Sequence, residues 1–553
     1  MSRSPIFDRF ARALRIAQYC EREKIPVEEG LDRAAAAEAQ DGKRRSGRRE
    51  FLADIGRLAV AGTAFGVAAQ LRVAQALAAS GNPGINVGIV GAGLAGLVCA
   101  DELTRNGIAF TLYEASERVG GRQYSFGVNE FFTGQSAERG GEFIDTPHKT
   151  LLAYANKFGL AKEDVNKTPG EIYYFFGGER HDESRVVEEL RAALPALHED
   201  LRALSAAPTA DNHTAADVVL DRMSLREYLE TRVAGRLARA VIDEAYVAEY
   251  GLETDRQGCF NFLLFTHLDR RSKFTPFGIS SDERYHIIEG NDRIAMGIRD
   301  RLPSPVQHGM RLVRVRRRNL GDVELTFKQG PRTLTAVHGA VVIAIPFTVL
   351  REIEMDFDAR NPLEAEKQLA IAQLGYGTNA KQMIQFSGRP WASQSVVSNG
   401  SSYSDLENCQ TTWQTNPLLA ANDHAVLTDY SGGDRGARLN PKAVQTEALR
   451  FLSDLEKVYP GALAAATRDP KLGFRAHLEH WPSNPLTKGS YTCYLPGQFT
   501  TIAGKEGKPI GNIHFAGEHT NSFYVWQGFM EGAALSGIDA ASQILAKLKK
   551  GVL

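Results

Sequence analysis

The chain has 553 residues, 43% of them hydrophobic and 24% charged, and this length predicts about three or four domains, or two large interleaved ones. Its 66 acidic and 65 Lys/Arg residues give a formal net charge of -1, which argues against nucleic acid as the main partner. The five cysteines are dispersed without metal-ligand or dithiol spacing, so we expect buried free thiols and no metal site. No uncharged apolar run reaches the ~18 residues of a permanent membrane span.

Residues 1–83 are expected to form either a leader or a helical arm. Residues 1–45 are charged and rich in alanine, with helical spacing over 7–14. The adjacent Arg48 and Arg49 precede Phe51-Leu52 and a small-residue apolar run that ends in Ala76-Leu77-Ala78-Ala79. These features resemble a twin-arginine export signal, which predicts a periplasmic or secreted protein. The alternative is an amphipathic helix that packs on the body or on a second subunit, with a cytoplasmic location.

A strand, glycine turn, helix and second strand open the folded body. The predicted strand at 86–90 runs directly into the turn that contains Gly91, Gly93 and Gly96, and a helix over 97–105 follows. A second strand over 108–113 ends at Glu114. In a dinucleotide site the three glycines permit the tight turn, the approach of a pyrophosphate and close helix packing, and the acid accepts from a ribose hydroxyl. A purely structural glycine turn would leave Glu114 unexplained.

The chain continues Ala115-Ser116-Glu117-Arg118-Val119-Gly120-Gly121-Arg122, and here it resembles the flavin-containing amine oxidase superfamily of monoamine, polyamine and L-amino acid oxidases. The resemblance covers most of residues 85–545 through scattered motifs, and it implies FAD rather than NAD. The N–H groups of the paired glycines and the two arginine cations suit phosphate or flavin. Further family segments imply FAD contacts at Gly141, Glu142, Phe143, Leu312, Gly517, Glu518, Phe529 and Met530.

The resemblance also implies the fold class, an α/β protein in which a Rossmann-like FAD domain is interleaved with a mixed-sheet and helical substrate domain. The FAD-binding parts are expected at residues 84–150, 285–350 and 505–553, the helical part of the substrate domain at 151–284, and its sheet at 351–504. Periodicity predicts strands near 312–315, 341–346, 383–386 and 424–430. It predicts helices within 185–245 and over 441–455 and about 534–549.

Four residues are implied by the resemblance to carry the chemistry. Lys381 matches a family lysine that holds a water near flavin N5, and its charge is expected to assist reoxidation of the flavin by O2. Tyr491 and Phe529 match the walls of an aromatic cage for the amine, and Trp481 lies in the same flavin-facing segment as Tyr491. The alternatives are a solvent-facing strand lysine and ordinary core aromatics.

The way the flavin is attached is also predicted from this segment. Monoamine oxidases carry a cysteine that binds the flavin covalently just before the cage tyrosine, whereas this chain has Ser490 there. Cys493, the nearest thiol, lies on the other side of Tyr491. Non-covalent FAD is therefore expected, and the resemblance favours a homodimer.

The substrate class is left between two alternatives. Many L-amino acid oxidases carry Met-Arg where this chain has Glu142-Phe143, which counts against a carboxylate and lets Glu142 contact a second amine. Exported bacterial members with such a segment nevertheless resemble amino acid oxidases. We expect oxidative deamination of an L-amino acid with a bulky or aromatic side chain, with a primary amine or polyamine as the alternative. The candidate carboxylate-binding residues are Arg139, Arg270, Arg271 and Arg284, and the pocket and substrate contacts are assigned to Glu142, Phe262, Phe265, Trp413, Tyr491, Trp526, Gly528 and Phe529.

Three other kinds of protein would share the nucleotide motifs. They are a flavin desaturase, a porphyrinogen oxidase and a non-catalytic FAD-bound interaction protein. Lys381 and the aromatic cage are not expected in the first two, and the third would lack the cage.

Overall fold

The structure is a computed structural model that describes residues 5–37, 85–264, 282–318, 321–357, 363–416, 423–471 and 473–553. The predicted twin-arginine segment with its alanine-rich end, and the candidate residues Phe265, Arg270 and Arg271, lie outside the described residues.

A four-stranded parallel sheet, ordered β2-β1-β12-β21, forms the centre of one half of the molecule. Its strands are β1 (Val87–Val90), β2 (Phe110–Tyr113), β12 (Ala340–Ile343) and β21 (Ile513–Phe515). The two central strands are short uninterrupted apolar runs with every residue buried, as expected where both faces of a parallel sheet are covered. The chain therefore enters this sheet in three separate segments, which is the interleaving that the sequence predicted.

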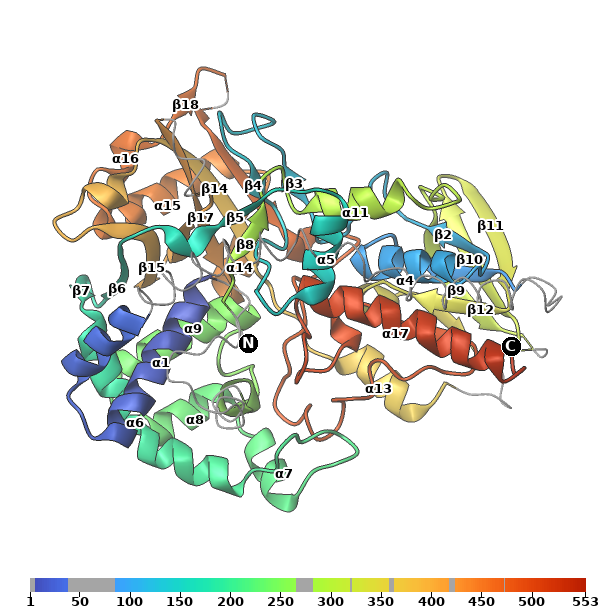
Figure 1. The fold of residues 1–553 in the computed structure, drawn as a ribbon, viewed down its shortest axis with the longest axis horizontal. Helices are drawn as coiled ribbons and strands as arrows, with labels where there is room; N and C mark the ends of the chain where they lie inside the picture. The colour runs from blue at the N-terminus through green and yellow to red at the C-terminus, as the bar shows by residue number, and fades with distance from the viewer. Residues whose placement is uncertain are drawn as a thin grey trace, which may run out of the picture.

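Two helices that are far apart in the sequence, α4 (Leu94–Arg105) and α17 (Met530–Lys549), lie side by side against this sheet (Figure 1). A Cβ added at Gly537 would lie 2.3 Å from the carbonyl oxygen of Ala95, so the two helices meet backbone to backbone. Both helices begin about one turn earlier than predicted. The predicted starts are wrong because residues assigned to the preceding glycine segments form the first helical turns.

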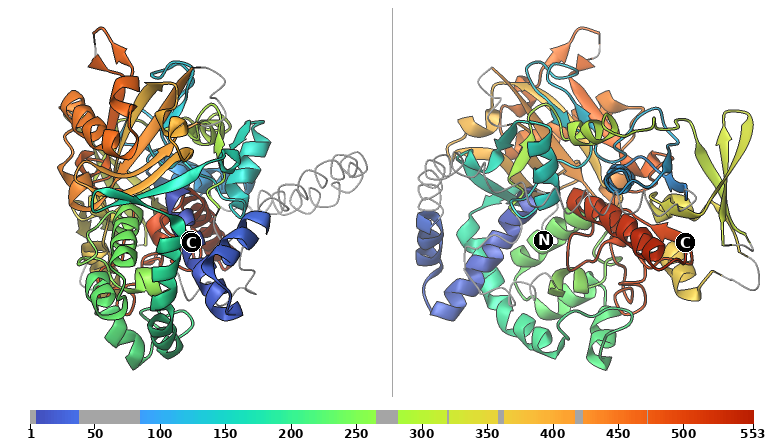
Figure 2. Two further views of the ribbon diagram at one scale, coloured as in Figure 1. Left: turned by 90° about the vertical axis from the view of Figure 1, so that its left-hand side faces the viewer. Right: turned by 45° about the vertical axis from the view of Figure 1, so that its right-hand side comes forward.

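A second sheet, ordered β11-β10-β9-β13, extends the same half of the molecule. It consists of β9 (Arg311–Arg317), β10 (Val323–Gln329), β11 (Arg332–His338) and the short β13 (Glu354–Asp356). Figure 2 shows β10 and β11 projecting as a hairpin at the edge of the molecule. The predicted strand at 312–315 lies within β9.

A seven-stranded mixed sheet, ordered β20-β14-β17-β16-β15-β6-β7, forms the second half. Its strands are β6 (Glu171–Phe176), β7 (Glu179–His181), β14 (Ala380–Ser387), β15 (Ser398–Leu406), β16 (Cys409–Gln414), β17 (His424–Ser431) and β20 (Ala476–His480). The predicted strands at 383–386 and 424–430 are confirmed as parts of β14 and β17. The helix predicted over 441–455 is α15 (Val444–Val458), which packs on this sheet.

Helices cover the rest of this half. They are α6 (Glu183–Ala203), α7 (Ala215–Asp221), α8 (Leu225–Arg232) and α9 (Arg236–Tyr250), within the predicted helical region, with α5 (Lys149–Lys157), α11 (Asp292–Arg299) and α13 (Ala365–Gln373) nearer the first half. α7 and α8 each begin with a capping box, in which Thr214 and Ser224 exchange hydrogen bonds with an acid three residues on.

The N-terminal segment is part of this folded body. Helix α1 (Pro5–Glu23) lies along α6 (Figure 1). A further helix over residues 27–37 packs on α1, since a Cβ added at Gly30 would lie 2.2 Å from Cys20 Sγ. Phe10, Leu14, Ile16 and Cys20 of α1 are buried in the same core as α6 and α9. Residues 5–37 thus form the helical arm that was one alternative from the sequence, whereas the export signal stays a prediction.

All five cysteines are free and buried, which confirms the interpretation of their spacing. Among the described helices, none is both long and apolar enough to cross a membrane.

Candidate active site

A cavity of about 410 Å³ lies between the two halves, with walls from both of them. At one end it is lined by the glycine turn after β1, by Glu114 after β2, and by the start of β9. At the other end it is lined by Lys381 of β14, Trp413 of β16 and Tyr430 of β17. One cavity therefore joins the predicted nucleotide segments to the mixed sheet.

The glycine turn has the shape that a pyrophosphate site requires. Gly91 has a φ of +102°, and a Cβ there would lie 2.5 Å from the carbonyl oxygen of Ala344 on the neighbouring strand segment. A Cβ at Gly96 would lie 1.9 Å from the carbonyl oxygen of Gly91, so α4 can pack against the turn only with glycine there. Gly93 faces the cavity, with no atom beyond its chain neighbours within 4 Å of the place that a Cβ would take. Among the described residues, no side chain caps the N-terminus of α4. The first N–H groups of α4 are thus placed to meet a phosphate.

Charged side chains around the turn are held by the protein and line the cavity. Glu114 accepts from the Ala92 N–H and from Ser116, both at 2.8 Å, and so joins the end of β2 to the turn. Arg118 donates to the carbonyl of Gly121 at 2.7 Å and stacks over the Tyr124 ring, and burial lowers the pKa of its guanidinium. The arrangement offers backbone N–H groups and a cation to the phosphates of a dinucleotide, so these residues fit FAD.

Arg122 ties this end of the cavity to the segment that carries the predicted cage tyrosine. It donates to the carbonyl oxygen of Ser490 at 2.5 Å and to Glu518 at 2.9 Å. Glu518 also accepts from Thr492 at 3.0 Å. Gly517, which precedes this acid, lines the cavity with a φ of +140°, a conformation that favours glycine.

An ion pair between Lys381 and Glu142 lies at the other end. The Lys381 ammonium donates to Glu142 Oε2 at 2.6 Å, to the carbonyl of Gly140 at 2.8 Å and to the carbonyl of Glu138 at 3.1 Å. The second oxygen of Glu142 accepts from the Trp413 indole N–H at 3.0 Å. The side chains of Lys381 and Glu142 are 6% and 3% exposed, so the predicted solvent-facing alternative for this lysine is wrong.

Aromatic side chains lie beside the ion pair, with the Trp413 and Tyr430 ring centroids 5.7 and 5.9 Å from Lys381 Nζ. Tyr430 lies across the strand pair from Lys381, and its hydroxyl is 2.7 Å from that of Tyr491. The Tyr491 hydroxyl in turn donates to the carbonyl of Glu249, at the end of α9, at 2.7 Å. Phe529 lines the cavity and packs edge-on against Trp526 with ring centroids 5.4 Å apart. The cavity thus ends in a wall of aromatic rings fixed by hydrogen bonds.

Asn291 holds the segment that carries Glu142. It is fully buried, and its side-chain amide donates to the carbonyls of Gly141 and Glu142 at 3.0 and 2.6 Å. Its own N–H donates to Glu138 at 2.8 Å. This asparagine was missed in the sequence, where it appears as an ordinary loop residue before α11.

The structure brings nearly all of the predicted site residues to one cavity. Those that line it are Gly91, Gly93, Glu114, Arg118, Gly121, Arg122, Gly141, Glu142, Phe143, Leu312, Lys381, Trp413, Trp481, Tyr491, Gly517, Glu518, Gly528, Phe529 and Met530. Gly96 lies behind the lining, where it permits the packing of α4. Tyr430 and Glu283 also line the cavity and were missed. The strand pairing of Tyr430 with Lys381 would have located it, had the register been known.

Besides Gly96, four predicted residues that the structure describes do not line this cavity. Trp526 lies behind Phe529 and packs on His148, and Phe262 belongs to the helical core beside Tyr246. Arg139 is paired with Glu479 at 2.6 Å, and Arg284 is paired with Asp164 at 2.6 Å. Their assignment to the pocket or to a substrate carboxylate is therefore corrected. Both arginines have carboxylate partners within the protein, and both aromatics are used in packing.

Residues 94–545 match the family model for flavin containing amine oxidoreductase, and the match spans the nucleotide segments and the mixed sheet. The chain belongs to this family. It is 26% identical to the L-amino-acid oxidase of Siganus canaliculatus over 84% of this chain and 86% of the relative. It is 25% identical to a putative L-amino-acid oxidase of Bacillus subtilis (strain 168) over 85% and 97%. Among solved structures, cyclohexylamine oxidase from Brevibacterium oxydans IH-35A matches its fold with a TM-score of 0.70 at 21% identity, over 84% of this chain and 100% of that one.

Membership of this family makes the protein a flavin-dependent oxidase of amines or amino acids, with FAD as the implied cofactor. FAD supplies the hydride acceptor and passes electrons to O2 when it is bound. The residues that would hold its phosphates and ribose are those of the glycine turn, Glu114, Arg118 and Arg122.

Proposed function

We propose that this chain oxidises the carbon next to a primary amine nitrogen, giving an imine that hydrolyses to a carbonyl compound and ammonia, with O2 reduced to H2O2. The observation that carries this proposal is the aromatic part of the cavity, where Trp413 and Tyr430 lie beside an ion pair of no net charge. Tyr491 and Phe529 line the same cavity. Aromatic faces bind the apolar body of an amine by dispersion and attract its cationic form. A neutral ion pair nearby does not force the bound nitrogen into its protonated form, which cannot release a hydride equivalent.

An L-amino acid with a bulky or aromatic side chain is the first of two candidate substrates. The names of the two relatives above support it, since the Siganus canaliculatus protein is called an L-amino-acid oxidase and the Bacillus subtilis protein a putative one. Such a substrate requires a cation for its carboxylate. Of the described arginines, those that line the cavity are Arg118, Arg122 and Arg311, and all three belong to segments assigned to the nucleotide.

A primary amine without a carboxylate is the second candidate, and the described geometry favours it. Five glutamates line the cavity. Glu142 is paired with Lys381, Glu518 with Arg122 and Glu352 with Lys488, and Glu114 accepts from the glycine turn. The carboxyl of Glu283, the fifth of these residues, would repel a substrate carboxylate and attract a second cationic group, as in a diamine or a basic side chain.

Matched pairs of substrates distinguish these candidates. We would assay H2O2 with L-phenylalanine against 2-phenylethylamine, L-tyrosine against tyramine, L-ornithine against putrescine, and L-arginine against agmatine. The members of each pair differ only in the carboxylate. Turnover of the amines alone would support the second candidate, and turnover of the amino acids alone the first. If no member of any pair bleaches the flavin anaerobically, the proposed oxidase function is wrong and a non-catalytic FAD-binding protein is indicated.

Non-covalent binding of FAD is part of the same proposal. Ser490 donates its hydroxyl to Asn379 at 2.6 Å, and no cysteine is found among the described residues that line the cavity. Acid precipitation should therefore release all of the yellow colour into the supernatant. Colour retained in the pellet would contradict this expectation.

Oligomeric state and location are proposed from the sequence alone. We expect a homodimer, to be checked by light scattering of the purified protein. Export through the twin-arginine route predicts that replacing Arg48 and Arg49 together by lysine keeps the protein in the cytoplasm. Equal periplasmic amounts of the variant and the native chain would argue against that route.

A further inference from the structure

The Lys381 ammonium has no hydrogen left for a water. An ammonium group carries three N–H donors, and those of Lys381 reach Glu142 Oε2, the Gly140 carbonyl and the Glu138 carbonyl at 2.6, 2.8 and 3.1 Å. The resemblance implied instead that this lysine holds a water beside the flavin. In this chain its donors are all used by the 138–142 segment.

Glu142 is equally fixed. Its two oxygens accept from Lys381 and from the Trp413 indole, and its backbone carbonyl accepts from Asn291 at 2.6 Å. Both members of the pair line the cavity and are almost fully buried. Where water is excluded, charges act on their neighbours more strongly than at a surface, and equal opposite charges at hydrogen-bond distance largely cancel.

We propose that the functional unit in this chain is the Glu142–Lys381 pair rather than the lysine alone. Glu142 is a positioning residue that cancels the ammonium charge at the substrate end of the cavity. The pair thereby sets the pH at which a bound amine loses its proton and becomes oxidisable. This inference rests on the proposed amine oxidase function.

Other charged and titratable groups near the pair do not duplicate this role. Glu479 lies across from Lys381 on β20, but it is paired with Arg139 and with His477. Burial raises the pKa of Glu138 well above its ordinary value, which favours an uncharged carboxyl group there. The remaining described groups in this part of the cavity are the hydroxyls of Tyr430 and Tyr491 and the carboxyl of Glu283. Arg122 is paired with Glu518 toward the nucleotide end. His480, next to Glu479 on β20, is bonded to Ser483 and Gly436 and does not line the cavity, and burial lowers its pKa.

Single substitutions should shift the pH dependence in opposite directions. Glu142→Gln leaves an uncompensated ammonium, which disfavours a protonated amine nearby. In the pH profile of the rate of flavin reduction at saturating amine, the acidic limb should then move to lower pH by about one unit. Lys381→Met leaves a carboxylate, which favours the protonated amine and should move the same limb to higher pH. A purely structural role would lower the rates without these opposite shifts.

The double variant is the decisive measurement. Glu142→Gln with Lys381→Met removes both charges, so its acidic limb should return to within about 0.3 units of the wild-type position. If the two single variants shift in the same direction, or the double variant departs further than either, the proposal is overturned.

A measurement without substrate separates this inference from the proposed function. Sulfite binds to a flavin and bleaches its colour, and it binds more tightly when positive charge lies near the flavin. The sulfite dissociation constant therefore reports the net charge of the Glu142–Lys381 pair. We expect about tenfold tighter binding in Glu142→Gln, weaker binding in Lys381→Met and near wild-type binding in the double variant. This order, found in a protein that no amine reduces, would support the charge pair and reject the oxidase function. Equal constants in all four proteins would overturn the inference.

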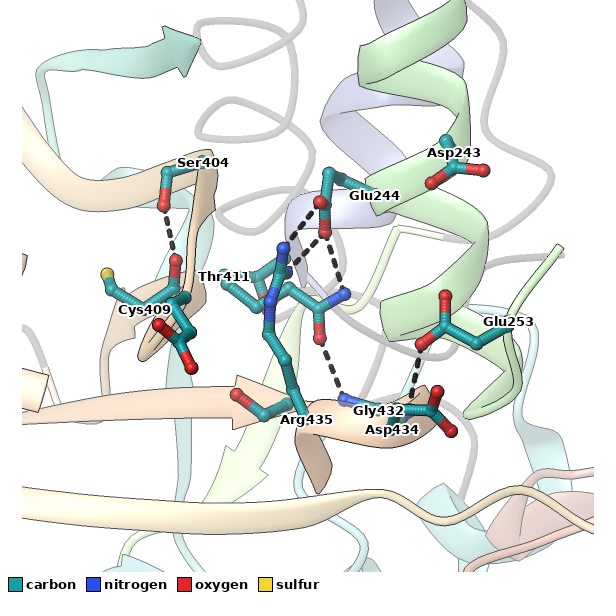
Figure 3. A network of polar contacts seen from close by, with 12 residues as sticks. Asp243, Glu244, Glu253, Ser404, Cys409, Thr411, Gly432, Asp434 and Arg435 are labelled. Carbon is teal, nitrogen blue, oxygen red and sulfur yellow. Dashed lines mark hydrogen bonds and ion pairs between the residues drawn. The ribbon is translucent and has the colours of Figure 1, made fainter. Parts of the chain in front are cut away.

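Two controls test for general disruption. Glu142→Asp keeps the charge and should keep the pH position, which guards against a Glu142→Gln protein that fails to retain flavin. Glu244→Gln breaks a different buried pair, with Arg435, at residues that do not line the cavity (Figure 3). It should lower stability and leave both the pH limb and the sulfite constant unchanged. A shift with Glu244→Gln as large as that with Glu142→Gln would contradict the assignment to the pair.

Discussion

Asp429 shows what burial does to a single carboxyl group beside the cavity. It precedes Tyr430 on β17, is 1% exposed, and accepts from the Gln410 N–H at 3.2 Å and from Ser431 at 3.0 Å. Loss of hydration raises the pKa of this carboxyl from 3.8 to about 7, because two neutral donors do not replace water around a charge. At neutral pH the folded protein therefore holds a group that is poised between its two states.

We predict that Asp429→Asn makes stability less dependent on pH. Because the folded-state pKa is raised, the contribution of Asp429 is fully present below pH 3.8 and is lost as the pH rises through about 7. Between pH 5 and pH 8 the wild-type free energy of unfolding should fall by about 2–3 kcal/mol relative to the variant. Urea unfolding at both pH values measures this difference. Asp434→Asn, at an exposed position, should lose as much stability between these pH values as the wild type. If the free energy of unfolding of Asp429→Asn changes with pH in parallel with that of the wild type, the expectation is refuted.

Sequence alone located Lys381 but not what it does. The residue stood out because a lysine among apolar strand neighbours is unusual, and Glu142 stood out beside the paired glycines. Their contact joins positions 239 residues apart, and no local pattern encodes such a contact. The same holds for Asn291, whose role depends on carbonyl groups of a segment about 150 residues earlier. Residue types at a site are predictable from motifs, whereas the hydrogen-bond partners that fix their charge are not.

At the scale of elements, a buried ion pair joins helix α9 to the mixed sheet. Arg435 of α14 (Gly433–Arg438) donates through both terminal nitrogens to Glu244 of α9, at 2.5 and 2.7 Å. Gln410 of β16 donates to the same carboxylate and accepts from the Gly432 N–H, so three elements meet at Glu244 (Figure 3).

We predict that Arg435→Ala lowers the free energy of unfolding by about 3–5 kcal/mol, because it leaves the Glu244 carboxylate buried without its cation. Urea unfolding at pH 7.5 measures the loss. Arg438→Ala is the matched control on the same helix, because its pair with Glu407 is exposed and should contribute less than about 1 kcal/mol. Equal losses in the free energy of unfolding for the two substitutions would show that the buried pair stabilises the fold no more than the exposed one.

Element types were more predictable than element ends or partners. Apolar runs identified β1, β12 and β17 because strands buried in a sheet have a simple composition. The starts of α4 and α17 were misplaced because a glycine turn and a first helical turn share residues. The order of the seven-stranded sheet could not be predicted, since its neighbours come from strands as far apart as β6 and β15.

At the scale of the whole molecule, the site exists only where the two halves meet. The nucleotide segments and the mixed sheet each supply one end of the cavity, and the chain crosses between them several times. Motifs in three separate segments made this interleaving predictable. The place of the N-terminal arm was not, because its amphipathic pattern suits a leader, a subunit contact and an intramolecular helix equally well.

The arm is tied to the body by both apolar and polar contacts. Phe10 and Leu14 are at most 1% exposed, and Phe10 meets Tyr246 of α9 edge-on with ring centroids 6.1 Å apart. Arg12 is paired with Glu183 at 2.6 Å, and Arg191 of α6 donates to the Ile25 carbonyl at 2.8 Å. Processing after the alanine-rich end of the predicted signal would cut the chain between this arm and the nucleotide sheet, so the arm would stay with the enzyme only through these contacts.

We predict that deletion of residues 1–37 lowers the free energy of unfolding by on the order of 5–10 kcal/mol, because it exposes the faces of α6 and α9 that α1 buries. Thermal and urea unfolding of the purified deletion protein measure this loss. A matched protein with a protease site inserted between Gly81 and Asn82 keeps the arm and only cuts the chain. After cleavage, the N-terminal fragment should co-elute with the body on gel filtration and the unfolding curve should stay close to that of the uncut protein. A deletion protein as stable as the full chain, or a fragment that separates without loss of stability, would show that the arm is not part of the folded core.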